Sequence, residues 1–259
     1  MSKISVVVPT YLEEGNIRDC LESVRWADEV IVVDAQSQDA TQSIAREMGA
    51  TALEFPREEK NHEKQRWHGI ERARHPWILC IDADERVSPP LAEEIRSMLE
   101  KGSDVDAYLI PFQNIFFGRL MRHGGLGDTA LLRLFRQGKA VYERGGEVHE
   151  QLVAKGKTLR LRNPIIHYGT RDLSHYFEKF NLYTSLSAGK LHRQGVRVTW
   201  RNALACYVMK PAYYFIKRFF LQKGFLDGPY GLMMAFLSTL TVVVNYLKLS
   251  EIQKRQNLE

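Results

Sequence analysis

Cysteine is scarce in this 259-residue chain. The three cysteines, Cys20, Cys80 and Cys206, lie far apart in the sequence. Zinc sites and small disulfide frameworks need cysteines at short, repeated spacings, so neither is expected to organise this fold. The composition, with 44% hydrophobic residues, instead predicts a sizeable apolar core in a protein of a reducing compartment.

The chain also lacks the apolar leader of a secreted protein and a glycine-rich phosphate loop. Residues 1–3 run directly into the short β-branched segment 4–8, whereas the apolar part of a leader has about 7–15 residues. The polar segment that follows contains a single glycine, Gly15, which argues against a sugar nucleotidylyltransferase. We therefore expect a cytoplasmic protein that begins with a β-strand.

Positive charge is concentrated near the C-terminus. From residue 190 to the end there are 11 Lys and Arg residues and three acidic residues, a net charge of +8. The first 189 residues have 25 basic and 28 acidic residues, a net charge of −3. The basic character of the protein therefore belongs to its C-terminal part.

Strand and helix patterns alternate over the first hundred residues. Apolar, β-rich runs at 4–8, 29–33, 51–55 and 77–81 alternate with helical spacings at 16–24, 41–48 and 63–74. This βαβαβαβ order predicts a mostly parallel sheet with helices on both faces. Further strands are predicted at 107–112, 131–135, 140–143 and 159–166.

Polar residues follow three of these strands, at the sheet edge where such folds bind ligands. They are residues 9–14, Asp34 and the triplet Asp82-Ala83-Asp84. Two carboxylates one residue apart offer hard oxygen ligands that suit Mg²⁺ or Mn²⁺ carrying a diphosphate. We expect the three clusters to meet in one cleft that supports a metal-assisted transfer from a nucleotide donor. A solvated loop with helix-capping aspartates is the alternative.

Four ordered segments within the first 85 residues resemble the nucleotide-sugar glycosyltransferases of the GT-A fold, in particular the inverting family 2 group. They are residues 8–17, residues 32–41, Lys64-Gln65-Arg66 with Gly69, and residues 81–85. Two later segments, 133–136 and 148–150, are similar to bacterial lipopolysaccharide-core β-glucosyltransferases. We therefore expect a GT-A domain at 1–190, with a donor half at 1–105 and an acceptor half at 106–170, and a membrane-associating helical region at 191–259.

The resemblance implies roles for the residues at the strand ends. The donor nucleotide-sugar would be bound by Pro9, Thr10, Tyr11, Glu13, Asp34, Lys64, Arg66, Asp82 and Ala83. Asp34 would accept a hydrogen bond from the base and so favour uracil. Lys64 and Arg66 would offset the charge that builds on the leaving diphosphate. The alternatives are a turn-capping carboxylate for Asp34 and a solvated helix face for the two cations.

The resemblance also implies a metal site for Mn²⁺ or Mg²⁺. Asp84 would bind the ion directly, and Asp82 would contact it or the donor ribose, in part through water. His167 would be a third ligand, which suits Mn²⁺ better than Mg²⁺. A hydrogen-bonded, half-buried histidine is the alternative for His167.

An inverting transfer to a hydroxyl needs a carboxylate that accepts the proton of the acceptor. Glu150, which follows Val148-His149, is the candidate for this base, and Glu147 and Asp128 are competitors. A phosphate acceptor is already an anion and needs no base, so a polyprenyl-phosphate glycosyltransferase is the main alternative function. A membrane-bound scaffold that keeps the fold without the chemistry is a second alternative.

Aromatic and basic residues are interleaved in the last third of the chain. Residues 172–190 have amphipathic helical spacing, and residues 207–225 contain seven aromatic and four basic residues. This mixture is typical of a helix in the headgroup region of an anionic membrane, and no nucleic-acid-binding module accompanies it. The uncharged segment 231–247 is at the lower edge of a membrane span; we interpret it as a monotopic or packing helix, or as a contact in a homo-oligomer.

These expectations together describe a peripheral protein on the inner face of the cytoplasmic membrane. It would transfer a sugar, with inversion, from a nucleotide-sugar, favoured to be a UDP-sugar. The acceptor would be a hydroxyl of a lipopolysaccharide core or of another lipid-linked glycan.

Overall fold

The computed structural model describes residues 2–57, 62–127, 129–143 and 151–256, which form two compact units. The first unit contains the described residues of 2–113 and 129–168, and the second contains 114–127 and 169–256. We expected a boundary at residue 190. Helix α5 (Leu173–Arg193) instead belongs to the second unit, because it packs along helix α7 (Gly228–Gln256).

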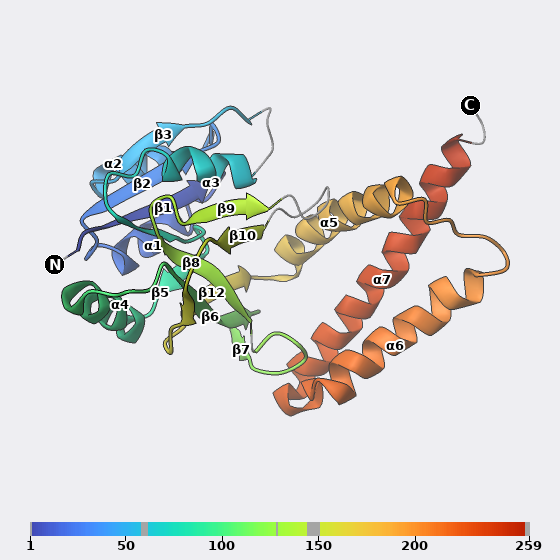
Figure 1. The fold of residues 1–259 in the computed structure, drawn as a ribbon. Coiled ribbons are helices and arrows are strands. Elements are labelled where there is room, and N and C mark those ends of the chain that lie inside the picture. The colour runs from blue at the N-terminus through green and yellow to red at the C-terminus, as the bar shows by residue number, and fades with distance from the viewer. Residues whose placement is uncertain (1, 58–61, 128, 144–150, 257–259) are drawn as a thin grey trace. The chain divides into compact units, whose positions relative to one another are not determined.

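The first unit begins with alternating strands and helices, as predicted (Figure 1). The elements are β1 (Ile4–Thr10), α1 (Ile17–Ser23), β2 (Glu29–Asp34), α2 (Thr41–Glu47), β3 (Thr51–Glu54), α3 (His62–Ile70) and β4 (Trp77–Cys80). The four strands pair in parallel in the order β3-β2-β1-β4. In this register Thr10 lies opposite Asp34, so the carboxyl ends of β1 and β2 meet at one edge.

The sheet continues beyond β4 with strands that are mostly antiparallel. The further elements are β5 (Glu85–Val87), α4 (Pro89–Lys101), β6 (Ala107–Phe116), β7 (Arg119–Met121), β8 (Ala130–Arg136), β9 (Ala140–Glu143), β10 (Gln151–Ala154), β11 (Thr158–Arg160) and β12 (Ile165–Thr170). The full order is β3-β2-β1-β4-β8-β6-β12-β5. The β4–β8, β8–β6 and β12–β5 pairs are antiparallel, so the sheet is parallel in its first half and mixed as a whole.

One predicted strand is two strands in the structure. Residues 159–166 were expected to be continuous, but β11 ends at Arg160 and β12 begins at Ile165. Pro164 lies in the interruption, and proline cannot donate a hydrogen bond to a strand ladder. The break lets β12 pair with β5, and that pairing places His167 opposite Glu85.

The core of the first unit lies on both faces of the sheet. Val6 and Val8 of β1 point to the face covered by α1 and α4, and Val7 points to the opposite face with Ile70 of α3. All three valines are fully buried. A strand buried on both faces reads as a continuous apolar run, which explains why the sequence pattern of β1 was clear.

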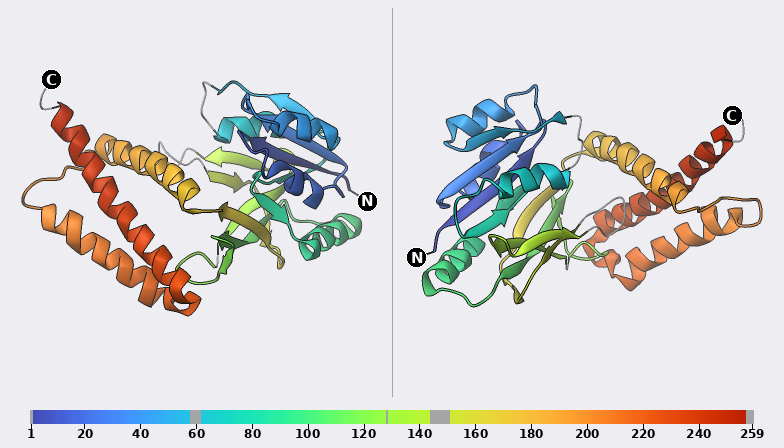
Figure 2. Two further views of the ribbon diagram at one scale, coloured as in Figure 1. Left: turned by 180° about the vertical axis from the view of Figure 1, so that it is seen from behind. Right: turned by 45° about the horizontal axis from the view of Figure 1, so that its top comes forward.

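The second unit is mainly helical (Figure 2). Residues 205–221 form one helix, in which α6 (Lys210–Ile216) lies between π-helical turns at Ala205–Met209 and Lys217–Leu221. A short 3₁₀ turn (Gly224–Asp227) leads into α7. Both α5 and α6 pack against α7.

Gly69 is a site where the fold excludes any side chain. A Cβ atom at this position of α3 would lie 2.5 Å from Val7 Cγ1 and 2.7 Å from Val33 Cγ2. Gly69→Ala should therefore lower the free energy of unfolding by about 1–3 kcal/mol through overpacking. Urea denaturation followed by circular dichroism measures this change.

Gly189→Ala is the matched control, because Gly189 also lies in a helix but its Cβ would meet no atom closer than 3.6 Å. Alanine is the better helix former, so this variant should be as stable as the wild type or more stable by up to about 1 kcal/mol. Equal stability of the two variants would show that α3 does not pack as closely on the sheet as described.

Candidate active site

The loops after β1 and β2 are connected by side-chain hydrogen bonds. Ser37 Oγ accepts a hydrogen bond from the backbone N–H of Leu12 at 2.8 Å, and Thr41 Oγ1 accepts one from the N–H of Glu13 at 2.9 Å. Leu12 and Gln36 have φ angles of 55° and 57°, a region that non-glycine residues seldom adopt outside turns and functional sites. The two loops therefore form one rigid edge.

Asp34 is buried at this edge and accepts four hydrogen bonds. The donors are the Thr10 hydroxyl at 2.9 Å, the Ser37 N–H at 2.8 Å, the Ser37 hydroxyl at 2.6 Å and the Gln42 amide at 2.8 Å. The carboxylate thus holds the turn, which was the alternative considered from the sequence. Its contact with a nucleotide base stays a prediction.

Gln65 joins the ends of β1 and β2 and was not predicted as a site residue. Its Nε2 atom donates to the carbonyl oxygens of Thr10 at 2.8 Å and Val33 at 2.7 Å. The side chain is buried on the sheet-facing side of α3. One signal could have identified it, since Gln65 stands between Lys64 and Arg66 in a segment that carried the family resemblance.

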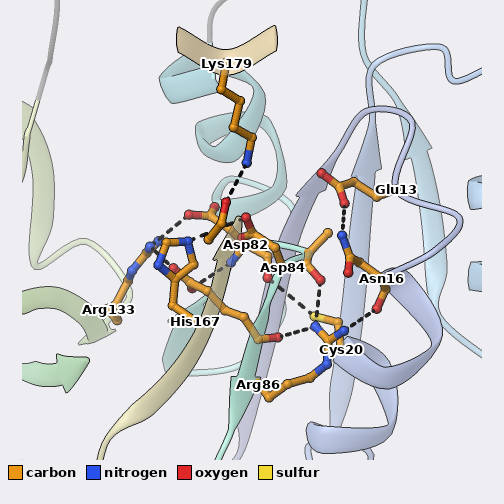
Figure 3. Close-up of polar contacts among 12 residues, drawn as sticks. Glu13, Asn16, Cys20, Asp82, Asp84, Arg86, Arg133, His167 and Lys179 are labelled. Carbon is orange, nitrogen blue, oxygen red and sulfur yellow. Dashed lines mark hydrogen bonds and ion pairs between the residues drawn. The ribbon is translucent and has the colours of Figure 1, made fainter. Parts of the chain in front are cut away.

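Asp82 is held between two arginines, Arg66 and Arg133, and Figure 3 shows Arg133 beside it. One carboxylate oxygen pairs with Arg66, and the other accepts a hydrogen bond from Arg133 at 2.9 Å. Burial opposes the ionisation of Asp82, but the charges of Arg133 and Arg66 hold the pKa of this carboxyl well below its ordinary value. Each oxygen of Asp82 is therefore paired with one arginine.

Arg133 also binds Glu85, and the sequence analysis assigned a role to neither residue. The guanidinium donates to Glu85 Oε1 at 2.6 Å, and Glu85 Oε2 accepts the backbone N–H of Asp82 at 2.8 Å. Burial raises the pKa of Glu85 to about 7, against the opposing effect of the Arg133 charge. Glu85 therefore fixes the backbone from which Asp82 and Asp84 project.

Asp84 and His167 lie side by side at the edge of the β5–β12 pair. The distance from Asp84 Oδ2 to His167 Nε2 is 3.5 Å. Burial lowers the pKa of His167, but the hydrogen bond and charge of Asp84 outweigh it and raise the pKa above its ordinary value. The backbone N–H of Tyr168 donates to the carbonyl oxygen of Asp84 at 2.9 Å, which ties the two strands together next to the pair.

This pair can supply part of a divalent metal site. Adjacent ligands of an octahedral ion at about 2.1 Å lie roughly 3 Å apart, so small adjustments let Asp84 and His167 bind one ion. Within the described residues no three His, Cys, Asp or Glu side chains gather closely enough to hold a metal. The donor set therefore fits an ion that is completed by substrate phosphates and water, as is usual for Mg²⁺.

Arg86 links the carboxylate loop to the loop after β1 (Figure 3). Its guanidinium donates to the carbonyl oxygens of Ala83 at 2.8 Å and Asn16 at 2.9 Å. The Asn16 side chain in turn donates to Glu13 Oε2 at 2.7 Å. The structure thus brings together two of the three strand-end clusters that the sequence placed at one cleft, and Gln65 connects the third.

The remaining predicted residues lie around this centre. Pro9 is buried in β1, and Tyr11 stacks under the guanidinium of Arg57 at 3.5 Å from the ring centroid. Lys64 lines a mainly apolar groove of about 450 Å³ with Trp67 and Tyr142. Lys64 thus faces this groove, and Arg66 contacts Asp82. The predicted base Glu150 and its competitors, Glu147 and Asp128, lie outside the described residues.

The family model for glycosyl transferase family 2 matches residues 5–170, which is more than half of the chain. The chain is a member of glycosyl transferase family 2. This membership and the order of β1 to β4 agree with the GT-A fold class predicted from the four sequence segments. All described site residues lie within the matched region.

Relatives of this family 2 protein include bacterial proteins. It is 24% identical to "Lipopolysaccharide core biosynthesis glycosyltransferase LpsC" of Rhizobium meliloti, over 87% of this chain and 86% of that protein. It is 27% identical to an uncharacterized glycosyltransferase of Rickettsia prowazekii, RP128, over 100% of this chain and 90% of that protein. Among solved structures, S. aureus TarS aligns with a TM-score of 0.49 and 16% identity, over 94% of this chain and 55% of that chain. The chain thus spans little more than half of that structure.

Arg133 should be essential for the stability of the site. Its removal leaves Glu85 buried without a cation and Asp82 with Arg66 alone, and breaking a buried ion pair typically costs about 3–5 kcal/mol. Arg133→Met should lower the free energy of unfolding by about this amount, measured by urea denaturation.

Arg18→Met is the matched control, since Arg18 also binds a carboxylate through two nitrogens but lies at the surface with Glu47 at 2.9 Å. An exposed pair is worth less than about 1 kcal/mol. If both variants lose similar stability, the buried cluster does not carry the energy assigned to it.

Proposed function

We propose that this protein transfers a sugar, with inversion at the anomeric carbon, from a UDP-sugar to a hydroxyl of a lipid-linked glycan. A lipopolysaccharide core is the favoured acceptor, and the inner face of the cytoplasmic membrane is the favoured place. Family membership supports the transfer, and the name of the R. meliloti relative, a lipopolysaccharide core biosynthesis glycosyltransferase, supports the acceptor.

The observation that carries the proposal is that the two aspartates have different partners. Asp82 is neutralised by Arg66 and Arg133, whereas Asp84 stands beside His167 at the carboxyl edge of the sheet. Asp84 and His167 would hold Mn²⁺ or Mg²⁺, with Asp82 in the surrounding shell. When bound, the cation would supply Lewis-acid stabilisation of the departing diphosphate.

The protein's own cations would bind and orient the diphosphate. Arg66 is largely buried, and its Nε has no hydrogen-bond partner among the residues that the structure describes. A buried, unpaired donor is costly, so an anionic substrate that accepts this hydrogen bond would be favoured. Lys64 is exposed on α3 and would meet the donor from the solvent side.

The nucleoside would lie against the edge formed by the loops after β1 and β2. Tyr11 offers an aromatic ring there, and Pro9, Thr10 and Glu13 belong to the same edge. Because Asp34 already accepts four hydrogen bonds, its preference for uracil would come from the turn that it holds and from any remaining acceptor capacity.

Glu150 would accept the proton of the acceptor hydroxyl. The oxygen would then attack the anomeric carbon from the face opposite the diphosphate, so that the configuration inverts. This assignment rests on the position of Glu150 after Val148-His149 in the sequence.

Asp84 should be required for turnover. Asp84→Asn removes the charge that would hold the ion and should lower the metal-dependent release of UDP from a UDP-sugar by about 100-fold, since metal stabilisation is worth several kcal/mol. The assay is UDP release from a panel of UDP-sugars with and without Mn²⁺.

Asp104→Asn is the matched control, because Asp104 is an exposed carboxylate paired with Lys157 at 2.6 Å. It should leave the rate unchanged. A wild-type protein without metal-dependent turnover of any nucleotide-sugar would support the non-catalytic scaffold instead.

Glu150→Gln separates the two kinds of acceptor. A general base contributes about 10²–10⁴-fold to the rate, so transfer to a hydroxyl should fall by this factor while calorimetry shows unchanged binding of UDP with Mn²⁺. Glu147→Gln and Asp128→Asn are the controls, and a larger loss in either would move the base to that residue. An unchanged rate in all three would favour the polyprenyl-phosphate acceptor, which needs no base.

A further inference from the structure

Large apolar side chains face outward along one side of the helix at residues 205–221. Leu204, Val208, Ile216 and Phe220 are 65%, 54%, 48% and 55% exposed, and they are spaced at multiples of four residues. Ala212, at the remaining position of this series, is exposed as well. Side chains four residues apart lie on the same side of a helix, so these five residues form a continuous stripe, here called the apolar stripe.

Polar groups lie on the opposite side of this helix, between it and α7. The Tyr207 hydroxyl bonds Ser250 Oγ at 2.7 Å, and Lys210 Nζ donates to the Tyr246 hydroxyl at 2.8 Å. The small side chain of Cys206 is also buried there. The polar contacts of the helix are thus made toward α7, and its exposed apolar stripe lies on the other side, the reverse of a helix in a soluble bundle.

The contact between α5 and α7 is polar as well. Lys248 Nζ donates to the backbone and side-chain oxygens of Asn181, to Thr184 Oγ1 and to Ser185 Oγ, all within 2.9 Å. Polar contacts between helices with apolar exteriors are typical of proteins whose surroundings are lipid. Within the described part of the chain, Gly224–Arg255 is the one helix long and apolar enough to cross a membrane, and 22% of its most apolar window is buried.

An aromatic residue and cations flank the apolar stripe. Trp200 is 84% exposed, and the guanidinium of Arg201 lies 5.3 Å from its ring centroid. Arg197 precedes them, and Lys223 is exposed just beyond the other end of the helix. Tryptophan prefers the boundary between water and lipid, and basic residues are attracted by anionic headgroups.

We propose that the apolar stripe and Trp200 form a lipid-binding face that inserts into one leaflet of an anionic phospholipid bilayer. The helix lies in the plane of the membrane, with the apolar stripe among the acyl chains. Arg197, Arg201 and Lys223 contact the headgroup phosphates. The proposal deepens the proposed location of the sugar transfer and rests on it only for the choice of the cytoplasmic leaflet.

Charge favours a bilayer over a second copy of the chain as the partner of the lipid-binding face. A symmetric dimer would bring the same surface of two molecules together, and residues 190–259 carry a net charge of +8 in each. Anionic lipid offers the opposite charge over the whole face. Lys210 lies in the middle of the helix, so a membrane-spanning orientation would place its charge near the bilayer centre, which is unfavourable, whereas an in-plane helix leaves it near the headgroups.

Vesicle flotation of the full chain tests the lipid-binding face. The wild type should float with vesicles of phosphatidylcholine and phosphatidylglycerol, and more weakly with phosphatidylcholine alone. Ile216→Glu combined with Phe220→Glu should reduce binding to the anionic vesicles at least about tenfold, because charged residues among acyl chains are costly. Leu159→Glu is the matched control, since Leu159 is equally exposed but lies on β11 of the other unit; it should bind as the wild type does.

A second measurement does not depend on a disruptive substitution. Lipids brominated on their acyl chains should quench part of the tryptophan fluorescence of the wild type, and this quenched part should be lost in Trp200→Phe. Unchanged quenching in Trp200→Phe would overturn the assignment of Trp200 to the membrane boundary.

The outcomes separate this proposal from the proposed function. The glutamate variant should release UDP from the UDP-sugar in detergent at the wild-type rate. A wild type that does not float, or that floats equally well with both glutamates present, overturns the lipid-binding face even if sugar transfer is intact. Light scattering that shows a dimer which the glutamates dissociate would assign the face to a second copy instead.

Discussion

The site depends on one buried cation. Arg133 binds Asp82 and Glu85 at once, and those carboxylates stand on either side of Asp84 in the sequence. Without this cation, Glu85 would be a buried carboxylate that has lost its ion pair, and Asp82 would keep only its pair with Arg66. One oxygen of Glu85 accepts the backbone N–H of Asp82 and the other accepts from Arg133, so the arginine helps to fix the segment that carries Asp84. The arginine comes from β8, which is antiparallel to β4. A strand of the antiparallel half of the sheet thus positions the carboxylates that follow the last parallel strand.

The two compact units differ in which side chains they expose. In the first unit apolar strands are covered on both faces and polar groups are collected at one edge, the usual arrangement when water surrounds the protein. In the second unit Thr184 and Cys206 are buried beside a small apolar cluster that includes Met121, Met234 and Leu237, and many other large apolar side chains are exposed. The first unit therefore suits water, and the exposed surface of the second suits lipid. The net charge of residues 190–259 is +8 and that of residues 1–189 is −3, so the positive charge lies in the part that would meet anionic lipid.

The sequence was sufficient where a pattern is local. β1 to β4 and their helices were predicted from apolar periodicity, and the carboxylates after β4 from their position at a strand end. Arg133, Gln65 and Arg86 were missed because each acts on a segment that is distant in the sequence: Arg133 is separated from Asp82 by 51 positions and Gln65 from Thr10 by 55. Nothing in a single sequence distinguishes such an arginine from the other basic residues of a strand. The pairing of strands in the antiparallel half was not predicted for a similar reason, since an alternating pattern predicts a strand but not its partner.

The Ser37 hydroxyl couples two loops. It donates a hydrogen bond to Asp34 in the turn after β2, and it accepts one from the backbone N–H of Leu12 in the loop after β1. Neither loop can swing outward alone without breaking this shared hydrogen bond and exposing a buried carboxylate. A displacement of one loop would therefore be transmitted to the other through this single hydroxyl.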